Sequence, residues 1–352
     1  MRAMILAAGY GTRFRPVTHQ YPKPMLPLCL RPLISWAIEP LLAAGVKEIA
    51  VNLHHLPDFI ERYLRGRYAS CCELYFSREE EILGTGGGIR RARPFLDRGD
   101  SFFVVNGDTI QFPPWNELEA SRRRQDAISA LCLRHPPEDD RFTPVWFDGE
   151  EVTGFGEGRG RALMFSGSHA LSTRVFDLLP DRDFSGITEH VYAPVTRNGS
   201  ERLAGVVDDG LWFDIGTPRR YLEASDRIRA LTVSGSLALP PAARVDHETE
   251  SVVADNAVLS RQSRRVTAGV GARVEEGAEL TGSVIWRGVS IGRGARVHGC
   301  IITDDVVIPP GRRMENALVC CTDGLDDLPP EATLCDELVV QPIDPACPMI
   351  CD

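Results

Sequence analysis

Residues 6–27 read LAAGYGTRFRPVTHQYPKPMLP and directly follow a short apolar run at the N-terminus. This stretch combines features that suit an anion-binding loop: glycines that let backbone N–H groups turn toward a ligand, a hydroxyl, and two cations. The residues that carry these features are Gly9, Gly11, Thr12, Arg13 and Lys23. A Gly-x-Gly after a strand is often only a turn, but the arginine behind it and the rigid Pro-Lys-Pro segment favour a phosphate-binding loop.

Length and composition limit the classes of protein to which this chain can belong. Its 352 residues exceed the size at which a single hydrophobic core usually stops growing, so we expect one large domain and a smaller one. A net charge of −10 argues against a nucleic-acid surface, which would concentrate Lys and Arg. No apolar run approaches the roughly 20 residues of a membrane span, and the ten cysteines are scattered as in reduced, cytoplasmic proteins. We therefore expect a cytoplasmic protein with no nucleic-acid or membrane partner.

The hydrophobic pattern around this loop alternates between strand and helix. The expected elements are a strand at Met4–Ala8, a helix from Pro32 to Gly45, a strand at Glu48–Leu53, a helix around Phe59–Leu64 and a strand at Glu73–Phe76. This order predicts an α/β protein with a parallel sheet and helices on both faces. Such sheets bind ligands beyond the carboxyl ends of their strands. We expect Pro40 to kink or split the first helix.

Two further segments place small residues where a ligand could approach the backbone. The glycine-dense segment Gly84–Gly88 precedes a basic helix that we expect at Ile89–Phe95. It has two explanations, a mobile loop or a close approach of the backbone to a planar base or sugar. In the apolar strand at Phe165–Leu171, Gly167 would let a ligand lie against the backbone. His169 in that strand is a candidate catalytic base, although a structural histidine is the more common case.

Two predicted apolar strands are each followed by an aspartate in a glycine-containing turn. Phe102–Val105 is followed within three residues by Asp108, and Leu211–Phe213 is followed directly by Asp214. A small number of carboxylates suits Mg²⁺, which keeps several waters and uses substrate phosphates for the rest of its shell. We therefore expect Mg²⁺ at Asp108 and Asp214, although Asp108 by itself could also merely close a turn.

The character of the sequence changes after Thr232. From about Ser251 to Ala317, apolar residues recur at intervals of six or five, with glycine or a small residue between them. The recurring residues are Val274, Leu280, Ile285, Ile291, Val297, Ile302 and Ile308. A period of six is typical of a parallel β-helix, in which each triangular coil takes three repeats. Three or four coils are few, so the array should gain stability from the first domain or from another copy, and we expect a homo-oligomer.

Both halves together resemble the sugar-1-phosphate nucleotidyltransferases, the NDP-sugar pyrophosphorylases, with a left-handed β-helix appended. The signature of that family matches this chain at Gly9, Gly11, Thr12, Arg13, Pro16, Thr18, Pro22, Lys23 and Pro24. The resemblance implies a Rossmann-like doubly wound mixed sheet, the nucleotidyltransferase fold, followed by a short left-handed parallel β-helix of hexapeptide repeats. Its domains would be a catalytic domain at 1–232, the β-helix at 233–319 and an acidic tail with proline and cysteine at 320–352.

The resemblance also implies the reaction and the residues that perform it. A phosphate oxygen of a sugar 1-phosphate attacks the α-phosphorus of a nucleoside triphosphate, and pyrophosphate leaves without a covalent enzyme intermediate. The catalytic arginine and lysine of the family fall on Arg13 and Lys23, and its metal aspartates fall on Asp108 and Asp214. Its nucleotide-binding residues correspond to Leu6, Ala8, Gly9, Gly11, Thr12, Arg13, Leu83, Gly86 and Gly87. Its sugar-phosphate-binding residues correspond to Asn106, Glu157, Arg159 and Gly167.

This chain departs from the family pattern around the expected sugar pocket. Many relatives carry Glu-Lys-Pro where it has Glu157-Gly158-Arg159, so Arg159 or Arg161 would replace a lysine that contacts the sugar phosphate. Phe142-Thr143 stands where relatives tend to place Tyr-Gly. The segment around Leu83 is closer to those of the mannose-1-phosphate guanylyltransferases and the muramate-type uridylyltransferases than to that of the thymidylyltransferases. The base of the nucleotide is therefore expected to be guanine or uracil.

Two rival interpretations remain beside a nucleotidyltransferase. One is a non-catalytic regulatory or assembly subunit of the same fold, which usually loses a signature residue, whereas Arg13, Lys23 and both aspartates are present here. The other is a bifunctional enzyme with an acyltransferase site in the β-helix. The array is short for that role, and His298 lies within a repeat turn, where a structural role is expected.

Overall fold

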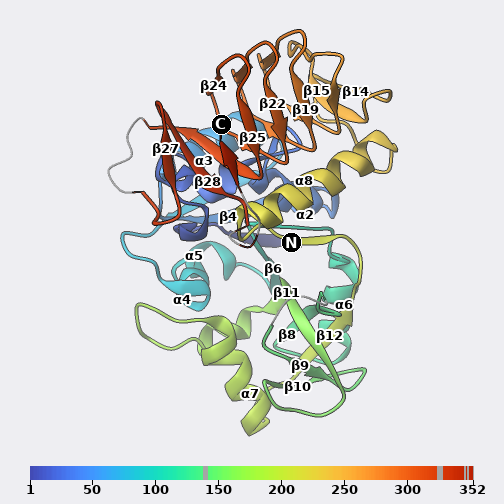
Figure 1. Cartoon of the computed structure of the whole chain (residues 1–352). Coiled ribbons are helices and arrows are strands. Elements are labelled where there is room, and N and C mark those ends of the chain that lie inside the picture. Colours follow the sequence, from blue (N-terminus) through green and yellow to red (C-terminus); the bar gives the residue numbers. More distant parts are fainter. Residues whose placement is uncertain (138–141, 323–327, 345, 347–348, 352) are drawn as a thin grey trace. The chain divides into compact units, whose positions relative to one another are not determined.

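The computed structural model describes residues 1–137, 142–322, 328–344, 346 and 349–351, and Figure 1 traces the chain. By internal packing the chain forms two compact units. The first contains residues 1–10 and 33–213, and the second contains residues 11–32 and 214–352. The stretch that carries the signature is therefore divided between the units just after Tyr10.

The first unit is built on a mixed β-sheet whose central strands are parallel. These strands lie in the order β6-β1-β4-β5, and parallel register joins each neighbouring pair. Their bounds are Arg2–Leu6 for β1, Glu48–Leu53 for β4, Glu73–Arg78 for β5 and Ser101–Asn106 for β6. Met4, Ala50 and Val104 are fully buried, as expected for strands covered on both faces. The predicted parallel sheet is confirmed.

Antiparallel strands extend the sheet beyond β6. They are β8 (Ser129–Arg134), β9 (Val145–Phe147), β10 (Val152–Phe155), β11 (Arg161–Ser172) and β12 (Leu203–Val207). Strand β11 runs antiparallel to β6, β8 and β9, while β12 lies parallel to β8. The pairing of β11 with β8 is irregular between Phe165 and His169, which includes Gly167. The combination of parallel and antiparallel strands is the mixed sheet that the sequence predicts.

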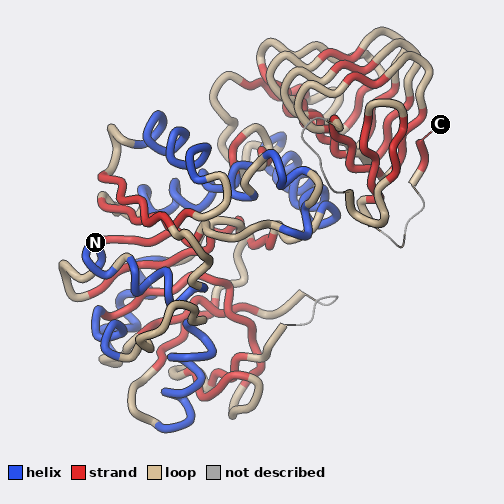
Figure 2. The backbone as a smooth tube through the Cα atoms, turned by 90° about the vertical axis from the view of Figure 1, so that its left-hand side faces the viewer, coloured by secondary structure: helices blue, strands red, loops and turns tan. Residues whose placement is uncertain are grey.

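Helices flank this sheet in the first unit (Figure 2). They are α2 (Leu33–Ala43), α3 (Pro57–Tyr68), α4 (Gly84–Arg91), α5 (Arg93–Leu96), α6 (Trp115–Arg124) and α7 (Ala193–Asn198). Pro40 does not split α2, which continues through it because its buried face, including Ile34 and Ile38, is held by packing, while the alternative of a kink stays a prediction. The expected basic helix is divided between α4 and α5, and Gly84–Gly88 are helical instead of forming a loop.

The second unit contains residues 11–32, helix α8 (Pro218–Val233) and a parallel β-helix. Figure 2 shows the coils of the β-helix as stacked short strands joined by turns. Three sheets form its faces: β15-β17-β20-β23-β26, β16-β19-β22-β25 and β18-β21-β24. Equivalent residues such as Val274, Ile291 and Ile308 pair across successive coils and are 17 positions apart. The predicted β-helix is confirmed, but each coil takes 17 residues and not 18, because one of its three repeats is one residue short.

The strands of the three faces are short. The first face contains β15 (Ser251–Ala254), β17 (Thr267–Ala268), β20 (Val284–Ile285), β23 (Ile301–Ile302) and β26 (Ala317–Cys321). The second contains β16 (Ser263–Arg264), β19 (Glu279–Thr281), β22 (Arg296–His298) and β25 (Arg313–Glu315). The third contains β18 (Arg273–Val274), β21 (Ser290–Ile291) and β24 (Val307–Ile308). Their inward side chains form one continuous apolar core.

Antiparallel strands pair with both ends of the coil stack. At the first end, β14 (Ala243–Asp246) pairs with β15. At the last end, β28 (Leu338–Pro342) pairs with β26 and with β27 (Thr333–Cys335), and β29 (Ile350–Cys351) pairs with β25. The described part of the predicted tail is thus a cap on the β-helix, and the predicted boundary at 319/320 falls inside β26. Pairing protects edge strands that would otherwise be open to another chain.

The compact units differ from the predicted division at residue 232. Helix α8 and residues 11–32 pack with the β-helix: the Tyr21 hydroxyl donates to Asp304 at 2.9 Å, and the Trp286 indole donates to the Tyr221 hydroxyl of α8 at 3.0 Å. Residues 11–32, which contain most of the signature, therefore belong to the same compact unit as the coils of the β-helix.

Candidate nucleotide and sugar-phosphate site

In the first unit, the residues predicted to bind nucleotide begin where strand β1 ends. The Gly107 amide donates to the Leu6 carbonyl at 2.8 Å, and the Ala7 amide donates to Oδ1 of Asn52 at 2.7 Å. A Cβ on Gly107 would lie 3.0 Å from the Leu6 carbonyl oxygen, so the turn after β6 packs closely on the end of β1. The carboxyl ends of β1, β4 and β6 are therefore joined by hydrogen bonds at one edge of the sheet.

A buried pair that the sequence analysis missed connects this edge to helix α4. Asn52 and Glu79 are each 4% exposed, and Nδ2 of Asn52 donates to Oε1 of Glu79 at 2.8 Å. The second carboxylate oxygen of Glu79 accepts from the Leu83 amide at 3.0 Å. Through this pair the structure links Ala7 with Leu83, and so links two of the segments predicted to bind the nucleotide. An asparagine at the end of an otherwise apolar strand, EIAVNL, was the available signal.

The glycines of α4 face a segment of the protein itself. A Cβ at Gly84 would lie 2.6 Å from the Ser185 carbonyl oxygen, and a Cβ at Gly87 would lie 2.6 Å from the carbonyl oxygen of Asp183. The amides of Gly86 and Gly87 both donate to the Ser185 carbonyl, at 2.7 and 3.1 Å. This close packing explains why the segment is rich in glycine, and the explanation does not require a ligand. Base binding by Leu83, Gly86 and Gly87 stays a prediction.

On the sugar side, the structure brings together two of the predicted residues. The side chain of Asn106, at the end of β6, lies against Gly167 of β11, where a Cβ would be 2.4 Å from Nδ2 of Asn106. Gly167 has φ +91, a backbone conformation that favours glycine, and it lies in the irregular part of β11. The neighbouring Ser166 carbonyl accepts from Gln111 at 3.3 Å and from the Trp212 indole at 3.1 Å. Trp212 and Gln111 are thus further polar groups of this region.

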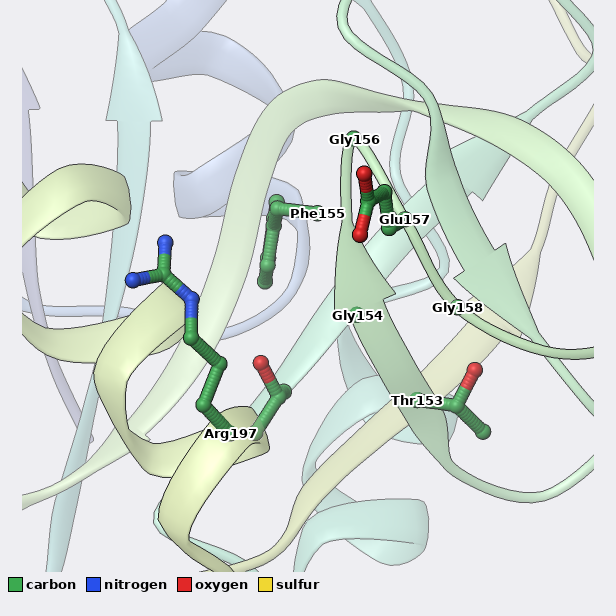
Figure 3. A pocket seen from close by; sticks show the side chains of 8 residues that line it. Thr153, Gly154, Phe155, Gly156, Glu157, Gly158 and Arg197 are labelled. Carbon is green, nitrogen blue, oxygen red and sulfur yellow. The ribbon is translucent and has the colours of Figure 1, made fainter.

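The other two predicted sugar-phosphate residues lie in the turn between β10 and β11. Glu157 lines an open cavity of about 590 Å³ together with Phe155, Gly156 and Arg197. Figure 3 shows the Arg197 side chain on one side of this cavity and Glu157 on the other, with the ring of Phe155 between them. Arg159 is exposed and does not line the cavity, so the cation that lines this cavity together with Glu157 is Arg197.

His169 lies in the interior of the first unit. Its side chain is wholly buried and shares a hydrogen bond with the Tyr192 hydroxyl, which itself donates to Ser129 at 3.1 Å. Burial lowers the pKa of His169 to about 3. A neutral imidazole held in the core by a tyrosine supports the structural role that was the more common expectation.

In the second unit, we use the term signature loop for residues 11–27. Gly11 begins it with φ +63, and its carbonyl accepts from the Thr18 hydroxyl at 2.9 Å. A Cβ on Gly11 would lie 3.0 Å from the Cβ of Lys23, so the two ends of the motif pack on each other. Lys23 is only 6% exposed, whereas Thr12 and Arg13 are exposed. The loop thus combines a rigid lysine with a hydroxyl and a guanidinium that solvent can reach.

Asp214 and Arg13 lie on either side of Gly216 in the same unit. A Cβ on Gly216 would be 2.9 Å from Oδ2 of Asp214 and 3.0 Å from the Arg13 guanidinium carbon. Oδ2 of Asp214 also accepts from the Arg220 guanidinium at 2.5 Å. Helix α8 begins immediately afterwards, and the hydroxyl of its N-cap, Thr217, accepts from the Arg220 amide. The structure therefore places one predicted metal aspartate beside a predicted catalytic arginine.

The donor chemistry of the two aspartates fits a hard divalent cation. Carboxylate oxygens from one or two residues are what Mg²⁺ takes from proteins. Asp108 lies in the two-residue turn after β6, and the Asp214 side chain is 20% exposed. Among the described residues, no group of three or more His, Cys, Asp and Glu could hold a metal. A cation at Asp214 would compete with Arg220 for the same carboxylate.

Comparison with known proteins defines the class. The nucleotidyl transferase family matches residues 2–230, and the GlmU-like C-terminal hexapeptide family matches residues 240–316. The chain belongs to the nucleotidyl transferase family. It is an enzyme that transfers a nucleotidyl group from a nucleoside triphosphate to a sugar 1-phosphate, giving an NDP-sugar and pyrophosphate. The resemblance implied by the signature motif is confirmed, and the regulatory-subunit alternative is not supported.

Among the relatives, a mannose-1-phosphate guanylyltransferase of Mycobacterium tuberculosis is 30% identical over 88% of this chain and 81% of its own length. A mannose-1-phosphate guanyltransferase of Hypocrea jecorina is 29% identical over 88% of this chain and 92% of its own. Among solved structures, HddC from Yersinia pseudotuberculosis complexed with GMP-PN has a TM-score of 0.55 and 26% identity, covering 64% of this chain and 99% of HddC. No helix in the described part of the chain is long and apolar enough to cross a membrane.

Proposed function

We propose that this enzyme joins GTP and mannose 1-phosphate into GDP-mannose and pyrophosphate, with Mg²⁺ as its metal. The observation that carries the proposal is that relatives named for this reaction, from a bacterium, a fungus and a plant, align over most of both chains. The neighbour solved with GMP-PN favours guanine over uracil, the two bases that the sequence left open.

In the proposed reaction, a phosphate oxygen of the sugar 1-phosphate attacks the α-phosphorus of GTP. The bond between that phosphorus and the bridging oxygen breaks, and its electron pair leaves with pyrophosphate. The nucleophile is already an anion, so no side chain has to remove a proton from it. The task of the protein is to offset the repulsion between two polyanions and to align them for in-line attack.

Four groups of this chain fit that task. The exposed Arg13 and the backbone around Gly9 would hold the triphosphate, and Lys23 would contact the phosphate at which substitution occurs. Mg²⁺ held by Asp108 and Asp214 would supply further positive charge to the phosphates. Because Arg220 pairs with Asp214, its guanidinium would orient that carboxylate before substrate binds.

For the sugar phosphate, the geometry favours two regions of the first unit. The Asn106 amide beside the Gly167 backbone offers donors and an acceptor for sugar hydroxyls. Glu157 and Arg197 offer a carboxylate and a cation around the open cavity. Arg159 stays in the proposal as an exposed cation of the same turn, as the family motif implies.

The direct test is a matrix of four nucleoside triphosphates against several hexose 1-phosphates, with pyrophosphate release as the readout and Mg²⁺ present. We expect the highest kcat/KM for GTP with mannose 1-phosphate. Faster turnover with UTP would move the base assignment to uridine, and turnover with no pair would contradict the proposal. Removal of divalent cations by EDTA should abolish the activity, and excess Mg²⁺ should restore it.

Assembly and location are part of the same proposal. The hexapeptide family match supports a homo-oligomer formed through the β-helix. The nucleoside triphosphate substrate supports the cytoplasm as the place of action. Light scattering of the purified protein would test the first point, because a monomeric mass at micromolar concentration would contradict it.

A further inference from the structure

Two successive coils of the β-helix turn a corner beside the signature loop within the second unit. Trp286 directly follows β20 and is 2% exposed, and Asp304 lies two residues after β23. The Trp286 amide donates to the Ile302 carbonyl at 2.9 Å, so the corners of the two coils are stacked. A tryptophan at such a corner can reach beyond the coil because its indole carries both a large apolar face and one N–H donor.

The first contact of this corner with the loop is made by Tyr21. Its hydroxyl donates to Oδ2 of Asp304 at 2.9 Å, and its ring lies edge-on to Trp286 with centroids 5.8 Å apart. Asp304 is itself held in place, since it accepts from the Arg287 amide at 3.0 Å and pairs with the Arg287 guanidinium at 3.1 Å. Burial and the neighbouring carboxylate raise the pKa of Tyr21 to about 12, which keeps its hydroxyl a donor at neutral pH.

The second contact runs through Tyr221 of helix α8. The Trp286 indole N–H donates to the Tyr221 hydroxyl at 3.0 Å, and that hydroxyl donates to the Pro27 carbonyl. The Tyr221 ring is fully buried and lies edge-on to Phe14 with centroids 5.5 Å apart. One side chain of the β-helix thus reaches the beginning and the end of the signature loop through a single buried tyrosine.

These two contacts bracket Lys23. Tyr21 stands two positions before it and Pro27 four positions after it, and Pro22 and Pro24 on either side restrict the backbone between them. Lys23 begins a short 3₁₀ turn and is nearly buried, so its direction follows from the direction of this backbone. A shift at either contact would therefore be transmitted to the lysine.

We propose that Trp286 and Asp304 of the β-helix are positioning residues that hold the signature loop so that Lys23 points at the reacting phosphate. The β-helix is then a working part of the nucleotidyltransferase site and not only an element of assembly. The inference rests on the proposed function, because it assigns the chemistry to Lys23. A displacement of about 1 Å at a reacting group is enough to lower turnover strongly.

The test compares Tyr21→Phe and Asp304→Asn with Tyr63→Phe as a matched control. Tyr63 also shares one hydrogen bond through its hydroxyl, with Ser35 at 2.7 Å, but it belongs to the first unit. We expect kcat to fall about five- to tenfold in the first two variants, the factor carried by one hydrogen bond of ordinary strength, with KM of both substrates within about twofold. The double variant should be no slower than the slower single variant, because Tyr21→Phe removes the hydroxyl of this bond and Asp304→Asn leaves one acceptor oxygen for both the Tyr21 hydroxyl and the Arg287 amide. The control should keep the wild-type kcat.

A second readout does not depend on activity. Hydrogen exchange of the amides in the signature loop, followed by mass spectrometry, should become about fivefold faster in Tyr21→Phe and Asp304→Asn and stay unchanged in the control. Trp286→Phe keeps an aromatic ring at the corner but removes the indole donor, so it should give the same two effects if the other variants fold poorly.

The outcomes separate the inference from the proposed function. Unchanged kcat together with unchanged exchange, or faster exchange without loss of kcat, would overturn the positioning role. Loss of kcat that follows Tm equally in all variants and in the control would overturn it as well. A wild-type enzyme that turns over no substrate pair, with variants that still exchange faster, would remove the proposed function and leave the contact between coil and loop in place.

Discussion

The two glycine-rich segments of this protein look alike in sequence but differ in what surrounds them. In helix α4, a Cβ on Gly84 or Gly87 would collide at 2.6 Å with a backbone carbonyl of the 183–185 segment. At Gly9, a Cβ would meet nothing within 4 Å, and Thr12 and Arg13 beside it are exposed. The glycines of the first segment make room for the protein itself, whereas Gly9 in the second leaves its backbone open to a ligand. Gly11, two positions later, resembles the first segment, since its Cβ would lie 3.0 Å from Lys23. Glycine density alone does not distinguish these two uses.

The largest effect should come from the nearly buried lysine of the signature loop. Lys23→Ala removes the cation that we place at the reacting phosphate, and we expect kcat to fall about 100- to 1000-fold, as for other preorganised charge-stabilising groups. Lys47→Ala, which removes an exposed lysine of the first unit, is the matched control and should keep the wild-type kcat. Steady-state kinetics at saturating substrates would measure both. A loss that parallels unfolding in circular dichroism would count against a catalytic role.

The comparison itself is tested by adding one methyl group to each segment. Gly87→Ala should lower the free energy of unfolding by about 1–3 kcal/mol, because its Cβ would press on the Asp183 carbonyl and on Leu83. Gly9→Ala should leave that free energy within about 0.5 kcal/mol and should instead raise KM for the nucleotide. Urea denaturation and initial-rate kinetics give the two quantities. Equal loss of stability in both variants would show that the segments do not differ as described.

A similar effect on stability is expected at the buried Asn52–Glu79 pair, which connects the sheet edge of the first unit to helix α4. Glu79→Gln replaces one acceptor oxygen by an NH₂ group, so either the Asn52 amide or the Leu83 amide loses its acceptor. We expect a loss of about 1–3 kcal/mol in stability and a higher KM for the nucleotide. Glu81→Gln, two residues away and exposed, is a suitable control. Unaltered nucleotide affinity would mean that this link does not shape the nucleotide site.

The last effect depends on pH and concerns the buried His169. The pKa of His169 is lowered to about 3 in the folded protein, against about 6.5 when unfolded, so below pH 6.5 the unfolded state binds a proton that the folded state does not. This contribution to stability is therefore present above pH 6.5 and declines toward pH 3, by up to about 1.4 kcal/mol per pH unit. His169→Gln should flatten the fall in Tm between pH 6.5 and 5, whereas His298→Gln, at an exposed position, controls for the loss of a histidine. Parallel curves for wild type and His169→Gln would refute this.

Local patterns in the sequence were sufficient for the class of fold and for the family. The alternation of apolar strands and helices predicted the parallel sheet, the short repeats predicted the β-helix, and the signature around Arg13 and Lys23 predicted the enzyme class. Each of these three predictions depends on residues that are close to one another in the chain, because periodicity and backbone conformation can be read directly from neighbouring residues. The family resemblance pointed to Asn106 and Gly167 as sugar-phosphate-binding residues, and the structure places them against each other, while their role in binding stays a prediction.

Contacts between residues remote in the chain could be found only in the tertiary structure. The Asn52–Glu79 pair, the 183–185 segment against α4, and the corner of Trp286 and Asp304 beside Tyr21 join residues that lie 27 to more than 280 positions apart. No local sequence pattern identifies such partners. The same side chain can stand at a given position whether it faces solvent or a residue of another coil. The sequence thus identified the chemistry, and the packing of distant segments determined which backbone groups remain open to perform it.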